Sequence, residues 1–290
     1  MARLRKIEAA ALNIKIYPHT TSKYVELFDK ADQLSHHVKI WDKYYGTIGW
    51  LRPIDESDPE AGIEGEIYKY LNIDPTKQWF DKKKNQSVKV DNKDNPPPIP
   101  DSLKPHLQEI YFVFFPKKHR LFFEANNISP KSALKLFDGL FHHPDITKEF
   151  GIPDIHVESS RETIEKILQI KKLAILEIQI ALPNPDDNGR SDEEKVLERM
   201  LGERARTVFE RKTAFKGESL KPDDNTKIMM KVATSNGKVY AEGYSESDVR
   251  VVESTENHPL RDKDYYNPDE ITVYEAFKLL VKKMIRKIGN

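Results

Sequence analysis

The stretch IYFVFFPKKHRLFFE, residues 110–124, decides the fold because two apolar, aromatic runs flank one basic turn. Continuous apolar runs with β-branched and aromatic residues are typical of strands that are covered on both faces. Pro116 cannot donate a hydrogen bond to a strand ladder, so we expect the chain to reverse at residues 116–119. The stretch therefore predicts a buried β-hairpin with a cationic tip at the heart of a domain.

The residues before this hairpin predict a small α+β unit. Apolar and polar side chains alternate over residues 9–17 as in a half-buried strand, with Asn13 and Lys15 as the polar members. Residues 20–37 have the three- and four-residue apolar spacing of an amphipathic helix. The aromatic-rich stretches 38–51 and 62–73 predict two further strands.

A proline run, NPPPIP at residues 95–100, separates this unit from the hairpin. Proline fixes φ and lacks a backbone N–H, so the run is excluded from helices and central strands and predicts a stiff spacer. We therefore expect an N-terminal α+β domain at 1–94, a proline-rich linker at 95–104 and a C-terminal α+β domain at 105–290.

After the hairpin, helices and strands alternate. Ser129 and Pro130 predict the start of a helix, and two pairs, Ser159 with Glu162 and Thr272 with Glu275, have the spacing of a capping box. Strands are expected at 155–157 and 171–182, a short helix at 159–168, helices at 191–211 and 222–234, a hairpin at 238–253 and a terminal helix at 273–290. The predicted fold class is α+β, in two domains, with mainly antiparallel sheets and helices packed on one face.

Composition limits the function. The 290 residues contain no cysteine, which excludes disulfides, thiolate zinc sites and cysteine nucleophiles and agrees with a cytoplasmic location. No apolar run approaches the roughly 18 residues of a membrane span, so no direct membrane insertion is expected. Because 47 basic residues balance 47 acidic ones, a nucleic-acid partner would have to be held by a local patch.

Common catalytic motifs are missing from the sequence. It has no GxGxxG, GxxxxGK[ST], GxSxG or HExxH motif, and we predict no catalytic residue, no metal and no cofactor. One nuclease-like pattern leaves an alternative open: Asp186 and Asp187, followed by Glu193 and Lys195. Two carboxylates could hold a divalent ion and the lysine could activate water. However, an acidic first helical turn has the same composition.

Three clusters of basic residues are candidates for phosphate contact. They are Lys82, Lys83 and Lys84, then Lys117, Lys118 and Arg120, and on the terminal helix Lys278, Lys282, Lys283, Arg286 and Lys287. Each cluster alone is equally typical of a solvated protein surface. Together they could span a DNA duplex if they share a face.

Tryptophans and neighbouring tyrosines offer a second mode of contact. Trp41, Trp50 and Trp79 could stack on nucleic-acid bases. Aromatic residues at strand spacing more often belong to a core, and we expect that role for these three.

Several segments carry a resemblance to known proteins. The order KKHRLFFE (117–124), SPKSALKLFDGLF (129–141) and LPNPDD (182–187), with LNIKIYPH (12–19) and GIEGEIYKYLNID (62–74), resembles an uncharacterised bacterial family of about this length. In layout the C-terminal part is similar to the RexA family of phage-exclusion proteins and to KwaB-type defence proteins. That similarity implies duplex DNA binding with little sequence preference, dimerisation, and abortive infection with a partner protein. The similarity assigns no functional role to any particular residue of this chain.

The leading hypothesis is thus a cytoplasmic, homodimeric, non-catalytic protein that binds double-stranded DNA without sequence preference in a phage-defence system, with a second defence protein as a further candidate partner. One alternative is a metal-dependent nuclease effector. The other is a protein-interaction subunit of a defence complex. Salt-sensitive duplex binding would distinguish the DNA-binding hypothesis from the interaction subunit.

Overall fold

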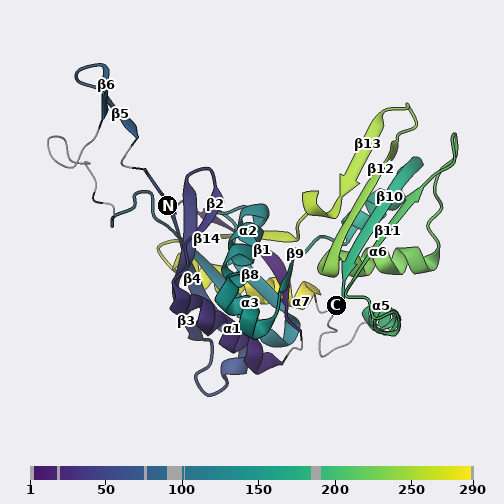
Figure 1. Cartoon of the computed structure of the whole chain (residues 1–290), viewed down its shortest axis with the longest axis horizontal. Coiled ribbons are helices and arrows are strands. Elements are labelled where there is room, and N and C mark those ends of the chain that lie inside the picture. The colour runs from purple at the N-terminus through teal and green to yellow at the C-terminus, as the bar shows by residue number, and fades with distance from the viewer. Residues whose placement is uncertain are drawn as a thin grey trace.

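The aromatic hairpin lies in the middle of a large sheet in the computed structural model, which describes residues 3–17, 20–74, 77–89, 100, 102–183 and 191–288 (Figure 1). Its strands are β7 (Gln108–Phe115) and β8 (Arg120–Glu124), joined by the 3₁₀ turn η2 (Pro116–Lys118). His119 closes the turn in the left-handed region with φ of 54°. The predicted chain reversal is confirmed.

The first sheet places these strands between elements that are far away in the sequence. Its order is β14-β1-β8-β7-β4-β3-β2, and every neighbouring pair is antiparallel. β1 pairs with β8 along one edge, while its other edge is shared by β14 and β9. The bounds are β1 Arg5–Lys15, β2 Val38–Trp41, β3 Tyr44–Pro53, β4 Ile63–Leu71, β9 Asp154–Val157 and β14 Arg261–Tyr266.

The stretch predicted as one strand at 38–51 is two strands, because Asp42 turns the chain with φ of 46°.

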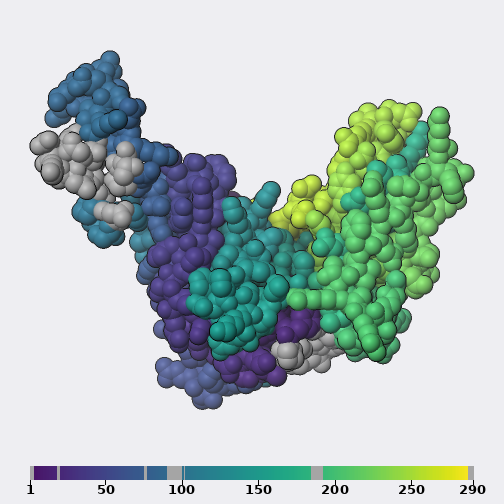
Figure 2. Space-filling model, in the orientation of Figure 1, coloured from purple at the N-terminus to yellow at the C-terminus, as the bar shows by residue number. Residues whose placement is uncertain are grey.

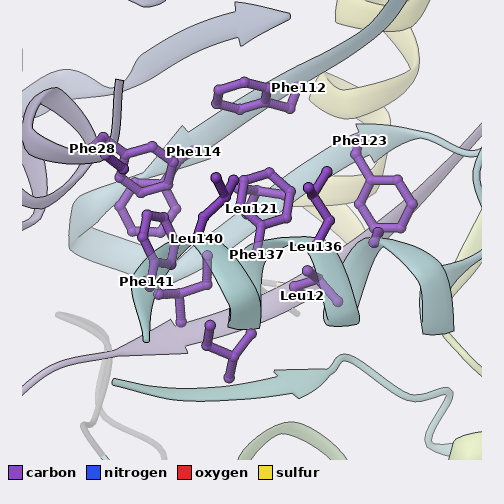
Figure 3. Packing of buried hydrophobic residues seen from close by; sticks show 14 of the residues in the cluster. Leu12, Phe28, Phe112, Phe114, Leu121, Phe123, Leu136, Phe137, Leu140 and Phe141 are labelled. Carbon is purple, nitrogen blue, oxygen red and sulfur yellow. The ribbon is translucent and has the colours of Figure 1, made fainter. Parts of the chain in front are cut away.

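Helices cover one face of this sheet. They are α1 (Thr21–Leu34), α2 (Pro130–Phe141) and the short α3 (Pro144–Phe150). Ser129 caps α2 through its side-chain oxygen, as the sequence predicts, and Thr20 caps α1 in the same way. Figure 3 shows Phe137 and Phe141 of α2 packed beneath the aromatic rings of the hairpin strand and α1.

The opposite face is covered in part by α7 (Val273–Ile288). Its Phe277 and Val281 pack on Val113 and Phe122, whose neighbours in the strands face α1 and α2. The hairpin is therefore covered on both faces, as predicted. The expected capping box of α7 is also present, since Thr272 and Glu275 exchange hydrogen bonds.

A second sheet lies beside the first, with the order β11-β10-β12-β13 (Figure 1). Its strands are β10 (Lys172–Ala181), β11 (Thr207–Thr213), β12 (Gly237–Tyr244) and β13 (Arg250–Ser254). α5 (Ser191–Gly202) and α6 (Asp224–Asn236) cover one face, and their buried side chains form a separate core. α4 (Glu162–Leu168) precedes β10, and the 3₁₀ turn η3 (Thr255–Asn257) follows β13. The predicted α+β class with mainly antiparallel sheets is confirmed.

The helix predicted at 191–211 ends early. α5 stops at Gly202, and 207–213 is the edge strand β11. There the half-buried residues Val208, Glu210 and Lys212 alternate with exposed ones, which is the period of a strand and not of a helix. The prediction of a helix as far as residue 211 depends only on the many charged residues of this stretch.

The strand pairing crosses the predicted domain boundary. β4 precedes the proline run and β7 follows it, yet the two are neighbours in one sheet, with Ile67 opposite Ile110. Both isoleucines are fully buried in the same core. Of the predicted linker at 95–104, residues 95–99 and 101 lie outside the described residues. The first sheet is thus built from both predicted domains.

A third, two-stranded sheet stands apart from the other two. It consists of β5 (Gln78–Asp81) and β6 (Gln86–Lys89), and it projects away from the body at the upper left of Figure 1. Figure 2 shows it as an arm, with a broad hollow between the first sheet and the second. The 3₁₀ turn η1 (Pro59–Ala61) lies between β3 and β4. Among the helices of the described ranges, none has both the length and the apolarity to cross a membrane.

Candidate nucleic-acid interface

Arg120, one of the predicted phosphate contacts, is buried. Its side chain is only 4% exposed, and its Nε lies 2.8 Å from Oε2 of the equally buried Glu158. Its Nη1 donates to the carbonyl oxygen of Lys118 at 2.9 Å. The predicted exposure of Arg120 is wrong because the residue is already the first of β8, so its side chain belongs to the sheet and not to the tip.

The tip of the aromatic hairpin is therefore less cationic than predicted. Lys117 is exposed and Lys118 is half-buried, while His119 is buried with Pro116. Of the predicted cluster, only these two lysines remain at the tip, and they lie next to α1.

The cationic face of α7 is partly neutralised by the sheet beneath it. Lys278 lies 3.3 Å from the carboxylate of Glu64 and 4.8 Å from the ring centre of Tyr274. Lys283 lies 3.2 Å from Asp264 of β14. Only the two cations Lys282 and Arg286 are exposed without an ion pair among the described contacts of this helix.

Lys287 belongs to the last turn of α7, but its side chain lies outside the described part of the structure.

The third cluster, Lys82, Lys83 and Lys84, forms the turn between β5 and β6, and all three side chains are exposed. The carboxylate of Asp81 accepts the backbone N–H groups of Lys83 and Lys84 at 2.9 and 3.1 Å, and Asn85 completes the turn with φ of 51°. The turn thus directs three ammonium groups into solvent. We call residues 77–89 the lysine hairpin; it has five lysines and one aspartate.

The structure does not bring the three clusters onto one face. The lysine hairpin and α7 occupy well-separated parts of Figure 1, and the tip of the aromatic hairpin lies against α1 on the other side of the sheet from α7. A single duplex spanning all three is not supported by this arrangement. The lysine hairpin is the most cationic of the three surfaces.

A groove lies between the lysine hairpin and the end of the first sheet. It has a volume of about 600 Å³. Lys39 of β2, Lys43 of the following turn and Tyr45 of β3 line one side. Lys77, Trp79 and Phe80 line it from the hairpin. The strand register explains the first side, because Lys39 and Tyr45 are direct partners and so point to the same face. We call this the aromatic groove.

The wall of the groove is held in place by backbone and ring contacts. The N–H of Asn72 donates to the carbonyl of Lys43 at 2.8 Å, which joins the exit of β4 to the β2–β3 turn. The ring of Tyr45 stacks on Tyr70 with centres 6.3 Å apart and planes 20° apart. The hydroxyl of Tyr70 is in turn 2.8 Å from Nδ1 of His37. Burial raises the pKa of Tyr70, so this hydroxyl stays neutral at physiological pH.

Aromatic side chains near the groove are unusually exposed. Trp41 is 66% exposed and stacks on Tyr44 with planes only 8° apart, while Phe80 is 67% exposed. The expectation that Trp41 belongs to the core is wrong, because β2 is the edge strand of the sheet and exposed residues alternate in it with the buried Val38 and Ile40. Trp50 is half-buried and donates its Nε1 to Glu66 at 2.8 Å. Trp79 is half-buried in the lysine hairpin.

The nuclease-like pattern is only partly described. Asp186 and Asp187 lie outside the described residues, and Lys195 is exposed on α5. Glu193 is buried in the first turn of that helix and acts on the pKa of Lys15. Over the described ranges, no three His, Asp or Glu residues are placed to hold a metal ion together.

Buried polar side chains join the two large sheets. The ammonium group of Lys15 donates to the carbonyl oxygen of Leu182 at 2.9 Å and to Oδ1 of Asn236 at 2.7 Å. Asn13 of the same strand donates to the carbonyl oxygen of Ser235 at 2.7 Å. The alternating pattern predicts both side chains on the solvent side of β1, but they are 0% and 1% exposed because the end of α6 covers them.

The same network reaches the buried arginine. Ser235 donates its hydroxyl to Oε1 of Glu158 at 2.5 Å, and Oε2 of Glu158 faces Arg120. A fully buried lysine loses its hydration, and this burial lowers the pKa of Lys15 to about 7, with Asp154 opposing the shift. None of the described cavities is lined by Lys15, Asn236 or Arg120. The network therefore serves to join the two sheets.

The comparison with known families covers nearly the whole chain. Residues 5–282 match the model of a family described as a domain of unknown function (DUF4747). The match confirms the resemblance to an uncharacterised family. No curated protein matches the chain.

Proposed function

The chain belongs to the DUF4747 family of domains of unknown function, and we therefore propose its function from its surface. We propose that it binds DNA without sequence preference and without catalysis. The observation that carries the proposal is the lysine hairpin beside the aromatic groove. It combines five lysines in 13 residues with exposed aromatic rings.

Lysine side chains that approach phosphates release the counterions condensed on DNA. This gain is independent of the bases, so the affinity depends strongly on salt and little on sequence. The net charge of the whole chain is zero, and long-range attraction would therefore come from the local field of the hairpin. The lysine hairpin projects from the body of the molecule (Figure 2), and the three lysines of its turn are exposed.

The sequence alone also motivates a wider proposal, through the layout in which we compare it with RexA-like and KwaB-type proteins. In it, the chain acts in the cytoplasm as a homodimer of a phage-defence system, with double-stranded DNA and a second defence protein as partners. The cations Lys117, Lys118, Lys282 and Arg286 would then be secondary phosphate contacts. The lysine hairpin would be the principal one.

The test is a titration of fluorescent 20-base-pair duplexes of two unrelated sequences at several salt concentrations. We expect similar affinities for both sequences and intact DNA after incubation with magnesium. Replacing Lys82, Lys83 and Lys84 by Ala should weaken binding to both duplexes. It should also lower the salt slope by roughly 0.9 for each phosphate that the variant no longer neutralises.

The matched control removes the same charge elsewhere. Lys131, Lys135 and Lys148 are exposed on α2 and α3, and their replacement by Ala should leave affinity and slope unchanged. Equal reductions in affinity for the two triple variants would show that only net charge matters and would contradict a specific role for the hairpin.

A further inference from the structure

The aromatic groove has the size and lining of a site for a small planar ligand. Its volume of about 600 Å³ falls inside the range of roughly 300 to 1,000 Å³ that is common for ligand pockets. Tyr45, Trp79 and Phe80 are the aromatic residues of its lining, and Lys39, Lys43 and Lys77 supply positive charge. Asp42 and Asp74 leave a net charge of +1 among the charged residues of the lining.

We propose that this groove takes an unpaired nucleotide of a single-stranded segment of DNA, with its base on the aromatic rings and its phosphates on the lysines. This inference rests on the proposed DNA binding and names the form of DNA that the groove selects. Bases in a duplex cover each other's faces, so only an unpaired base can offer a face to an aromatic side chain. Such stacking tolerates any base, in keeping with binding without sequence preference.

The platform under the base is already ordered. Tyr70 supports one ring face of Tyr45, and His37 fixes the hydroxyl of Tyr70. A ring held in this way loses little freedom when a base stacks on it. On the facing side, Trp79 is half-buried and its cross-strand partner is Val88. The two walls come from different sheets, one from the end of the first sheet and one from the two-stranded sheet.

The lysines of the hairpin turn extend the groove. Lys77 lies at its start, and Lys82, Lys83 and Lys84 lie at the far end of the same two-stranded sheet. A strand with one base in the groove would therefore continue along a cationic track. Single-strand binding proteins combine these two features, a positively charged path and stacking rings.

The experiment compares three fluorescent probes of equal length with the full chain: a dT single strand, an abasic strand with the same backbone charge, and a blunt duplex. We expect the dT strand to bind at least about 10-fold more tightly than the abasic strand, because only the former has bases to stack. Trp79→Leu should remove most of this difference and leave duplex binding unchanged. Trp79→Phe should restore it in part.

Phe215→Leu is the matched control, since Phe215 is 81% exposed in a loop after β11 and far from the groove in sequence and sheet. It should bind all three probes like the wild type. Two results would overturn the groove proposal without affecting the proposal of DNA binding. One is an equal affinity of the wild type for the dT and abasic strands. The other is that Trp79→Leu weakens binding to the dT strand and to the duplex by the same factor. Failure to bind any of the three probes would overturn both proposals.

Discussion

The ammonium group of Lys15 is fully buried between the two large sheets. Loss of hydration favours the neutral amine, and the nearby guanidinium of Arg120 acts in the same direction. The pKa of Lys15 is lowered to about 7 in the folded state, compared with 10.5 for the free side chain. Two hydrogen bonds to Leu182 and Asn236 nevertheless hold the group in place.

This shift makes stability depend on pH in a defined direction. Between pH 7 and 10.5 the unfolded chain binds a proton at Lys15 that the folded chain has released. The free energy of unfolding should therefore rise with pH in this window, by up to about 1.4 kcal/mol per pH unit from this group. Below pH 7 both states are protonated, and the contribution to the slope disappears.

Urea unfolding of wild type and Lys15→Met at pH 6, 7, 8 and 9 isolates this contribution, because all other groups are common to both. The difference in unfolding free energy between the two proteins should change with pH in favour of the wild type above pH 7. A constant difference from pH 6 to pH 9 would contradict a lowered pKa of Lys15.

Single residues also show the limits of sequence analysis. Lys15, Arg120 and Trp41 have ordinary places in their local patterns: a polar residue in an alternating strand, a cation at a turn and an aromatic in a strand. Their real exposure is set by distant elements. α6 covers Lys15, Glu158 pairs with Arg120, and the edge position of β2 leaves Trp41 in solvent. Lys15 and Arg120 are far away in the sequence from the residues that cover or pair with them. The edge position of β2 depends on the pairing of the whole sheet.

Elements with strong local signals could be predicted. The central hairpin, the cap of α2 and the capping box of α7 all depend on residues within a few positions of each other. β11 could not, because the charged run after Ser191 masks the two-residue period of Val208, Glu210 and Lys212. The two strands of the lysine hairpin could not be predicted either, because each spans only four residues.

The lysine hairpin contributes little to either large core. Phe80 is mostly exposed, and no hairpin residue belongs to the buried clusters of the described chain. Its lysines can therefore be replaced without a loss of stability, as surface changes usually alter it by less than about 0.5 kcal/mol. We expect the triple alanine variant at Lys82, Lys83 and Lys84 to have the melting temperature of the wild type. Any weakening of its DNA binding then comes from the loss of the three surface charges and not from unfolding.

At the scale of the whole molecule, the first sheet combines strands from both ends of the chain. β1 pairs with β8, β9 and β14, and β4 pairs with β7. Pairings between segments so far apart in the sequence leave no local pattern. The proline run is a clear local signal, and for that reason it suggested a boundary that the sheet crosses.

A fragment of residues 105–290 tests how the two parts depend on each other. Without β1 and β4, the hairpin strands would expose both edges and much of the aromatic core. We therefore expect the fragment to show weak near-ultraviolet circular dichroism from its aromatic rings and no cooperative unfolding of the first sheet in urea. Limited proteolysis of the full chain that releases a stable, cooperatively folded 105–290 fragment would support separate domains instead.

The central claim is that DNA binds at the lysine hairpin and the aromatic groove. Photo-crosslinking of the full chain to a single-stranded DNA probe, followed by mass spectrometry of the peptides, locates the bound strand directly. We predict crosslinks in peptides that contain residues 39–45 and 77–84, and their disappearance when an unlabelled dT strand is added in excess. Crosslinks confined to α7 or to the second sheet, with none in the hairpin or the groove, would contradict the claim.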